Sequence, residues 1–249
     1  SILKVFDMTV ATTGNNEKLL KRFNIPYEKS FTHSASHAGY YPEALPLSIK
    51  LIFSPDNGKI LGAQIVGYDG VDKRIDVIAT AIRTGMTVYD LEKLELAYAP
   101  PYSSAKDPVN MAGYVASNIL KGDSAIIHWH DIEKLDWEKT VLIDVRTPKE
   151  YSLGTIEGAK NIPVDELRNR LSEIPKDREI IIFCQIGLRG YIACRILRQK
   201  GYKKVKNLSG GYKTYFPAVQ KQDNPDIYQY EKIEKSDLIK ASEPSAVEE

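Results

Sequence analysis

Along the first 120 residues, apolar positions recur at spacings that are typical of both strands and helices. The predicted strands are short runs rich in apolar residues, and they cover Val5–Thr12, Pro46–Ser54 and Lys59–Tyr68. The predicted helices carry an apolar face or an N-terminal cap, and they cover Asn15–Phe23, Val71–Arg83 and Pro108–Leu120. Asn57-Gly58 lies between two of these strands and favours a hairpin, because such a pair tolerates positive φ. We therefore predict an α+β fold, with an antiparallel sheet, for this part.

The second half of the chain changes to strands that alternate with helices. Predicted strands cover Thr140–Val145, Glu179–Phe183 and Lys204–Leu208, and predicted helices cover Pro148–Ser152, Val164–Ile174 and Leu188–Lys200. This alternation is typical of a small parallel α/β sheet, which binds ligands beyond the carboxyl ends of its strands. Lys121-Gly122-Asp123-Ser124 is the expected boundary. We expect one domain over residues 1–122, a second over 123–220 and a polar, mobile tail over 221–249.

Composition narrows the class of protein. The 249 residues are 43% hydrophobic and 27% charged, as in an ordinary globular protein. A net charge of +1 gives no reason to expect nucleic acid or a membrane as a partner. The two cysteines make no disulfide framework, so we expect a reducing, cytoplasmic setting. The chain starts without Met inside a strand-like run, and we expect it to be part of a longer protein.

Cys184 is the strongest chemical signal in the sequence. It ends the strand-like run Glu179–Phe183 and precedes a loop whose residues are Gln185, Ile186, Gly187, Leu188, Arg189 and Gly190. The N–H groups of such a loop and the positive end of the following helix both favour the thiolate, which is the nucleophile. Cys194 lies inside the predicted helix, where packing in the core is the expected role and a resolving disulfide is the alternative.

The histidines of the chain are not expected to bind a metal ion. His33 and His37 are four residues apart, but the Ser, Ala and Gly residues around them do not favour a helix, and no carboxylate completes a metal site. His128 and His130 flank Trp129 and are predicted to alternate on a strand as surface residues. We expect no metal.

Residues 126–216 resemble a single-domain rhodanese. The resemblance rests on Asp144-Val145-Arg146, Gly158-Ala159-Lys160-Asn161-Ile162-Pro163, the Cys184–Arg189 loop and Leu208-Ser209-Gly210-Gly211. It implies sulfur transfer through a persulfide on Cys184, with Asp144 and Arg146 as supporting residues. Thr155 stands where many members of the family have His, and Tyr215 where many have Trp.

The Cys184 loop also bears on the substrate. Four residues separate Cys184 from Arg189, whereas a phosphatase loop of the related cell-cycle type has five, so the loop suits a single sulfur atom. Arg189 either positions an anionic substrate or holds the loop by pairing with Asp144. Arg146 and Glu150 are predicted to form a structural pair below the loop. Because the loop interior is nearly uncharged, a bulkier thiol or persulfide is favoured over thiosulfate as donor.

Residues 1–120 resemble the C-terminal dimerisation domain of pyridine nucleotide–disulfide oxidoreductases, in the coenzyme A-disulfide reductase and NADH oxidase branch. The matching stretches are His33–Pro42 and Leu96–Pro108. The resemblance implies that Tyr40 and Tyr98 belong to a coenzyme A-disulfide site across a homodimer. Their alternative role is that of ordinary interface aromatics.

Together the two resemblances imply the C-terminal portion of a coenzyme A-disulfide, persulfide or polysulfide reductase fused to a rhodanese domain. The intact enzyme would use FAD, NAD(P)H and coenzyme A and would act on small thiols, persulfides or polysulfides. The N-terminal FAD and NADH domains are missing, and no Gly-x-Gly-x-x-Gly turn occurs, so this piece alone is expected to bind no such cofactor. The alternatives are a non-catalytic dimerisation and sulfur-carrier module, or a stand-alone thiosulfate-type sulfurtransferase.

Overall fold

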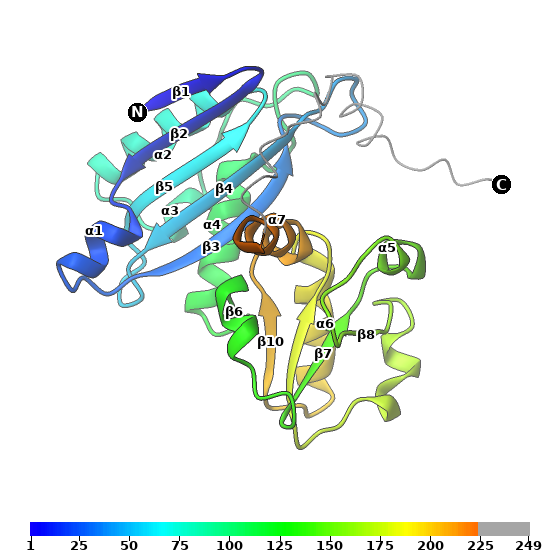
Figure 1. Cartoon of the computed structure of the whole chain (residues 1–249). Coiled ribbons are helices and arrows are strands. Elements are labelled where there is room, and N and C mark those ends of the chain that lie inside the picture. Colours follow the sequence, from blue (N-terminus) through cyan, green and yellow to red (C-terminus); the bar gives the residue numbers. More distant parts are fainter. Residues whose placement is uncertain (224–249) are drawn as a thin grey trace. The chain divides into compact units, whose positions relative to one another are not determined.

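The computed structural model describes residues 1–223 and contains two compact units, which we describe separately (Figure 1). One unit comprises Ser1–Leu120, and the other begins at Lys121. The first has an antiparallel sheet and the second a parallel sheet, which confirms the predicted fold class. Residues 221–223 belong to the last helix, and the rest of the predicted tail lies outside the described residues.

The first unit is built on a five-stranded sheet with the order β1-β2-β5-β4-β3. Its strands are β1 (Ile2–Val5), β2 (Met8–Gly14), β3 (Glu28–Ala35), β4 (Pro46–Phe53) and β5 (Ile60–Gly67). Leu47, Ile49 and Leu51 alternate along β4 and are fully or almost fully buried. Alternation places these three side chains on one face of the sheet, and that face therefore carries the core.

Helices cover this buried face of the sheet. The helices are α1 (Glu17–Arg22), α2 (Val71–Arg83), α3 (Val88–Leu91) and α4 (Pro108–Leu120). In the core, Ile75 and Ile78 of α2 and Ala112 and Ala116 of α4 join the buried strand residues. Helix α2 contacts β2 and β5, and α4 contacts β3 and β4, so the two helices divide the sheet between them (Figure 1). Asp107 caps α4 as predicted, because its carboxylate accepts a hydrogen bond from the N–H of Val109.

The predictions for this unit contain one wrong strand and miss two elements. The single strand predicted over Val5–Thr12 is wrong, because the chain turns at Phe6-Asp7 and forms the β1–β2 hairpin. Phe6 has a φ of 50°, a left-handed conformation that is uncommon for an aromatic residue, so local sequence signals do not predict the turn. Strand β3 and helix α3 were not predicted. In α1 only Leu20 is buried, and Leu19 and Phe23 are exposed.

A buried arginine connects the loops of the first unit. Arg74 of α2 is 1% exposed and pairs with Asp107, which is 2% exposed, at 3.0 Å. The same guanidinium donates to the backbone carbonyls of Gly70 and Ser36, at 3.0 and 2.6 Å. The hydroxyl of Ser103 also donates to Asp107, at 2.7 Å. This network therefore joins α2, the segment after β3 and the loop before α4.

The second unit is a five-stranded parallel sheet with the order β6-β10-β9-β7-β8. Its strands are β6 (Ile126–Ile127), β7 (Thr140–Asp144), β8 (Lys160–Asn161), β9 (Glu179–Phe183) and β10 (Val205–Leu208). Its helices are η1 (Trp129–Lys134), α5 (Pro148–Ser152), η2 (Leu167–Asn169), η3 (Leu171–Glu173), α6 (Leu188–Gln199) and α7 (Gly211–Asp223), the η elements being 3₁₀ helices.

Both faces of the second sheet are buried. Ile180 and Ile182 of β9 pack in one core cluster with residues of α6, while Ile181 and Phe183 pack in the other with Tyr212 of α7. Because side chains alternate along a strand, a continuous apolar run is what a strand covered on both sides requires. The run Ile180-Ile181-Ile182-Phe183 was correctly predicted as a buried strand.

Two predictions for the second unit are wrong. The segment 164–174 is not one α-helix but contains two short 3₁₀ helices, η2 and η3, with Leu167 and Ile174 buried. The N–H groups of Leu167, Arg170 and Ile174 bond to carbonyls three residues back, as in 3₁₀ turns. The hydroxyl of Tyr202 also donates to the carbonyls of Leu171 and Ile174. His128 and His130 do not alternate on a strand, because η1 begins at Trp129 and their rings lie 5.6 Å apart.

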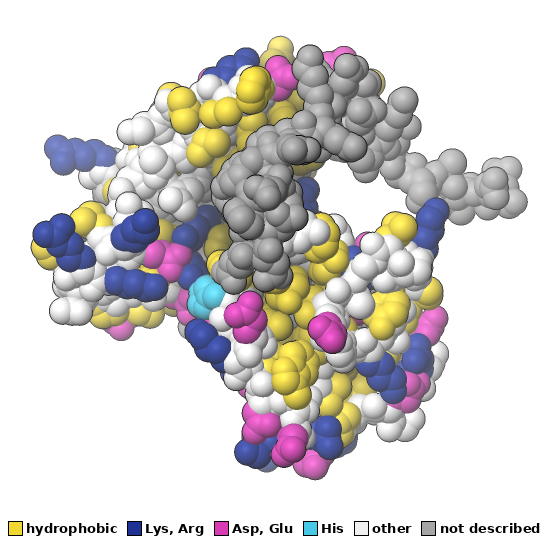
Figure 2. All heavy atoms as spheres, viewed as in Figure 1, with side chains coloured by type: hydrophobic (Ala, Val, Ile, Leu, Met, Phe, Trp, Pro, Cys, Tyr) yellow, Lys and Arg dark blue, Asp and Glu magenta, His cyan; other side chains and the backbone are white. Residues whose placement is uncertain are grey.

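The surface mixes apolar and charged side chains (Figure 2). In the first unit, exposed apolar side chains gather on the β1–β2 hairpin and around α1, and they are Ile2, Leu3, Val5, Phe6, Val10, Leu19, Phe23 and Ile25. Within residues 1–223, no helix has the length and apolar character that crossing a bilayer would need.

We predict that Arg74→Met destabilises the first unit by about 3–5 kcal/mol, because the carboxylate of Asp107 would stay buried without its partner. Both tryptophans, Trp129 and Trp137, lie in the second unit. In urea, the transition seen by far-ultraviolet circular dichroism should therefore shift, while the transition seen by tryptophan fluorescence should not. Lys73→Met, which changes an exposed neighbour, is the control and should shift neither.

Candidate active site

Cys184 lies at the carboxyl end of β9, at the first residue of the loop that leads into α6. Cys184 is fully buried, and its Sγ accepts a hydrogen bond from the N–H of Gly187 at 3.1 Å. Gly187 is the N-cap of α6 and has a φ of 110°, so the chain reverses there in a conformation that favours glycine. The backbone thus directs an N–H donor and a helix N-terminus at the sulfur, as the sequence predicted.

The Gly210-Gly211 turn holds the other side of the loop. The N–H of Tyr212 donates to the carbonyl of Cys184 at 2.8 Å, and that of Lys213 to the carbonyl of Gln185 at 2.9 Å. A Cβ on Gly211 would lie 2.4 Å from the oxygen of Cys184. Glycine is therefore required here for close approach of two backbone segments, which explains the Leu-x-Gly-Gly motif.

Asn207 of β10 contacts the loop and was missed by the sequence analysis. Its Nδ2 donates to the carbonyl of Gly187 at 3.0 Å, and its side chain packs so closely on Gly190 that a Cβ there would lie 2.2 Å from Oδ1. Asn207 is 7% exposed, and its Oδ1 has no hydrogen-bond partner among the described residues. The strand Val205–Leu208 also contains Lys206, so its sequence pattern does not single out Asn207.

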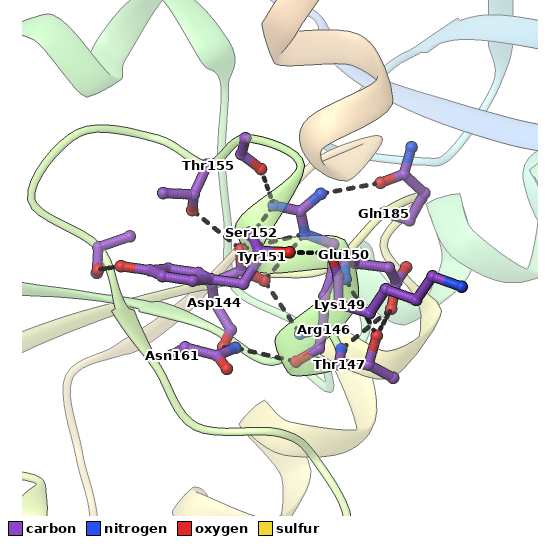
Figure 3. Close-up of polar contacts among 12 residues, drawn as sticks. Asp144, Arg146, Thr147, Lys149, Glu150, Tyr151, Ser152, Thr155, Asn161 and Gln185 are labelled. Atoms are coloured by element: carbon purple, nitrogen blue, oxygen red, sulfur yellow. Dashed lines mark hydrogen bonds and ion pairs between the residues drawn. The ribbon is translucent and has the colours of Figure 1, made fainter.

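Asp144 and Arg146 form a buried ion pair beneath the loop (Figure 3). They are 0% and 3% exposed, and the guanidinium of Arg146 reaches the carboxylate at 2.7 Å. Arg146 also donates to Oε1 of Gln185 at 3.2 Å and lies over the ring of Tyr212, 4.3 Å from its centroid. The hydroxyl of Thr155 donates to the same carboxylate at 2.9 Å. Arg146 therefore connects the carboxylate of Asp144 to Gln185 of the loop.

Arg189 pairs with Glu150 of α5, at 2.6 and 2.7 Å through two nitrogens. The predicted pair of Arg146 and Glu150 is wrong, because Arg146 pairs with Asp144. Of the two alternatives for Arg189, the pairing with Asp144 is not formed either. The hydrogen bond from Arg189 lowers the pKa of Glu150 to about 2, and those from Thr147 assist. In return, Glu150 raises the pKa of Arg189, and the nearby sulfur of Cys184 adds to that effect.

Apolar side chains are exposed on the loop and just after α5. Ile186 and Leu188 are 39% and 57% exposed, and Leu153, directly after α5, is 82% exposed. Gly190 is buried against Asn207, so the side-chain surface of the loop consists mainly of Gln185, Ile186 and Leu188. None of these three side chains carries a charge.

Cys194 has a different environment. It is 1% exposed within the core cluster of α6, and burial raises the pKa of its thiol to about 12. Both cysteines are free. Such a thiol is a poor nucleophile, because the thiolate is the reactive form.

Tyr40 and Tyr98 meet in the first unit. Their hydroxyl oxygens are 3.1 Å apart, and this hydrogen bond raises the pKa of Tyr40. Both side chains are exposed, at 76% and 50%. Tyr40 lies in the loop after β3, and Tyr98 lies in the loop before α4. The buried Arg74–Asp107 pair connects these two loops through Ser36 and Ser103 and so helps to position the tyrosines.

The histidines of this unit have polar partners of their own. Nδ1 of His33 lies 2.7 Å from the hydroxyl of Ser48, and Nε2 of His37 lies 3.0 Å from the carbonyl oxygen of Pro42. Among residues 1–223 there is no group of three side chains able to hold a metal ion.

Comparison with family models matches both units. Residues 1–108 match the pyridine nucleotide-disulphide oxidoreductase dimerisation domain, and residues 130–217 match the rhodanese-like domain. The chain therefore joins a member of the dimerisation-domain family to a member of the rhodanese-like family.

Three relatives match different shares of the chain. A coenzyme A disulfide reductase of Staphylococcus epidermidis is 44% identical over 116 residues, which are 47% of this chain and 26% of the relative. The structure of reduced Bacillus anthracis CoADR-RHD is 60% identical with a TM-score of 0.86, covering 89% of this chain and 40% of that one. An NAD-dependent persulfide reductase of A. fulgidus is 44% identical with a TM-score of 0.76, covering 85% of this chain and 38% of that one. The chain thus spans less than half the length of each of these relatives.

We predict that Asn207→Ala loosens the Cys184 loop, because the carbonyl of Gly187 loses a buried donor. The second unit should lose about 1–2 kcal/mol of unfolding free energy, measured by tryptophan fluorescence in urea. Alkylation of Cys184 by iodoacetamide should also slow, since the N–H of Gly187 would no longer be fixed on the sulfur. Asn169→Ala, at an exposed position, is the matched control. Unchanged stability and alkylation in Asn207→Ala would show that Asn207 does not hold the loop.

Proposed function

We propose that the chain is the C-terminal portion of an FAD- and NAD(P)H-dependent coenzyme A-disulfide, persulfide or polysulfide reductase. In this proposal the second unit carries sulfane sulfur as a persulfide on Cys184. The observation that carries it is the position of the sulfur, at the carboxyl end of β9 and 3.1 Å from the N–H of Gly187. The two similar structures, CoADR-RHD and the persulfide reductase, support it because each covers both units.

The proposed transfer needs only the sulfur and its surroundings. The thiolate of Cys184 attacks the outer sulfur of a donor R–S–SH, the S–S bond breaks, and the electron pair leaves with R–S⁻. The product is Cys184–S–SH, and no net oxidation occurs. The N–H of Gly187 and the N-terminus of α6 stabilise negative charge on the attacking sulfur. An acceptor thiol then removes the outer sulfur by the same exchange.

Two alternatives belong to different classes. A carrier module would bind one sulfur and release none, and a stand-alone sulfurtransferase would turn over with thiosulfate. An acceptor assay with cyanide or a thiol separates them, because turnover identifies a transferase and stoichiometric persulfide without turnover identifies a carrier. We propose a reducing compartment such as the cytoplasm, where the two free thiols would persist.

The first unit would serve the reductase. We propose that it forms a homodimer and that Tyr40 and Tyr98 contribute to a coenzyme A-disulfide site. The sequence contains no Gly-x-Gly-x-x-Gly turn to hold a dinucleotide. FAD and NAD(P)H are therefore assigned to other parts of a longer protein, and no residue of this chain is assigned to them.

Cys184 should gain one sulfur on exposure to a sulfane donor, and Cys194 should not. The reason is that Cys184 faces an N–H donor, whereas burial keeps Cys194 protonated. Intact-mass spectrometry should show one added sulfur in the wild type and in Cys194→Ser, and none in Cys184→Ser. A persulfide that persists in Cys184→Ser would overturn the proposal.

Tyr98→Phe should slow coenzyme A-disulfide reduction in the flavin-containing protein by on the order of a hundredfold, the usual cost of one lost donor to a developing anion. Sulfur loading of Cys184 should not change, because the tyrosine pair belongs to the first unit. Sedimentation of the variant should give the same homodimer as the wild type, which separates lost chemistry from lost assembly. An equal loss in sulfur loading would mean that Tyr98 serves Cys184 instead.

A further inference from the structure

We infer that Glu150 sets the donor specificity of the Cys184 site: by neutralising Arg189, it selects organic persulfides, which carry at most one charge at the reacting group, over the thiosulfate dianion. This inference rests on the proposed sulfur transfer and names its substrate class. The structure supports it through the charges around the loop, the fixed position of the Glu150 carboxylate and the apolar surface at the opening.

Each of the two arginines at the loop is paired with a carboxylate. Arg146 lies beneath the loop and is paired with Asp144 at 2.7 Å. Arg189 ends the loop and is paired with Glu150 through two short contacts. The four residues between Cys184 and Arg189 are uncharged. The two arginines therefore bring no net positive charge to the sulfur, and a dianion would gain little attraction from them.

Two further cations lie on adjoining segments. Lys149 is an exposed residue of α5, and Lys213 is on the first turn of α7. Within the described residues, neither ammonium group hydrogen-bonds to Cys184, to the loop or to Glu150. Arg189 is thus the cation that ends the loop, and its electrostatic effect on the sulfur depends on Glu150.

The carboxylate of Glu150 is fixed from two sides. It is the third residue of α5, and its Oε2 accepts hydrogen bonds from the N–H and the hydroxyl of Thr147, both at 3.0 Å. This is a capping box, which either Glu or Gln can complete. The same Oε2 receives Arg189 at 2.7 Å. Helix capping therefore holds the negative charge against the arginine whether or not substrate is present.

The opening of the loop suits an organic group. Ile186, Leu188 and Leu153 are exposed apolar side chains on the loop and just after α5. Leu153 follows Glu150 by three residues, about one helical turn. An organic persulfide can lay its carbon skeleton on such a surface, whereas thiosulfate offers only charged oxygens. Both donors react at the sulfane sulfur, and the leaving group is a thiolate in one case and sulfite in the other.

The test compares two donors on one variant. Glu150→Gln keeps the capping box but removes the charge that neutralises Arg189. The rate of sulfur loading on Cys184, followed by intact mass, should rise about tenfold with thiosulfate, which corresponds to about 1.4 kcal/mol. With benzyl persulfide the rate should change less than about twofold, since this donor carries at most one charge. Added salt should reduce the gain with thiosulfate.

Glu179→Gln is the matched control. Glu179 begins β9, at the end of the strand opposite Cys184, and pairs with Lys206 at 2.7 Å. The control removes one carboxylate charge at the far end of the strand that leads to Cys184, and it should leave the ratio of the thiosulfate rate to the benzyl persulfide rate unchanged. The inference is overturned if the ratio of the thiosulfate rate to the benzyl persulfide rate does not change in Glu150→Gln. It is also overturned if this ratio rises equally in Glu179→Gln.

Tryptophan fluorescence checks that Glu150→Gln is folded. If Glu150→Gln is not folded, Arg189→Gln gives the converse test, because this variant removes the cation. Its rate of sulfur loading from thiosulfate should be no higher than that of the wild type. A higher rate contradicts the inference. The proposed function fails separately, if wild-type Cys184 loads sulfur from neither donor.

Discussion

The buried ion pair between Asp144 and Arg146 is the interaction on which the geometry of the second unit depends. Arg146 joins β7 to the carbonyl of Gly154, to Gln185 in the loop and to the ring of Tyr212 in α7. A buried pair of this kind adds little net stability, yet the loss of one partner typically costs several kcal/mol, because the remaining charge stays buried. The pair therefore acts as a constraint. It fixes the segments that surround Cys184 in one arrangement, since every alternative leaves a charge or a carbonyl without its partner.

The two arginines of the site show what the sequence could and could not predict. Cys184 and Arg189 were predicted to share one loop from the strand–loop–helix pattern, and Asp144 and Arg146 were assigned beside it by resemblance. Their pairing was not predicted correctly, because it depends on the direction in which each side chain leaves its strand. Asp144 is the last residue of β7, and its carboxylate also accepts the N–H of Arg146, a local contact two residues away at 2.9 Å. That contact favours Arg146 over Arg189 and leaves Arg189 to the carboxylate that caps α5.

The same distinction between local and distant constraints explains the fold. Helix α2 and strands β4, β5 and β9 were predictable, because each carries its periodicity within its own residues. The β1–β2 hairpin was not, because Phe6 adopts a positive φ that its residue type disfavours. In the segment 164–174, apolar residues three or four apart fit an α-helix and short 3₁₀ turns equally well. A residue outside the segment also contributes, because the hydroxyl of Tyr202 donates to the carbonyls of Leu171 and Ile174.

Around Cys184, the motif residues and the residues that set charge have separate tasks. Gly187, Gly190 and Gly211 are required because backbone or the side chain of Asn207 lies where a Cβ would otherwise stand, or because φ is positive. These glycines give the loop the shape that directs the N–H of Gly187 at the sulfur of Cys184. They do not determine which sulfur donor the site prefers. The charge of the site depends on Glu150, which the loop motif does not contain and which lies 34 residues before Cys184. Among the described residues, α5 provides the only carboxylate that contacts Arg189. A chain can therefore keep the glycines of the Cys184 loop and change its preferred sulfur donor through a substitution in α5 alone.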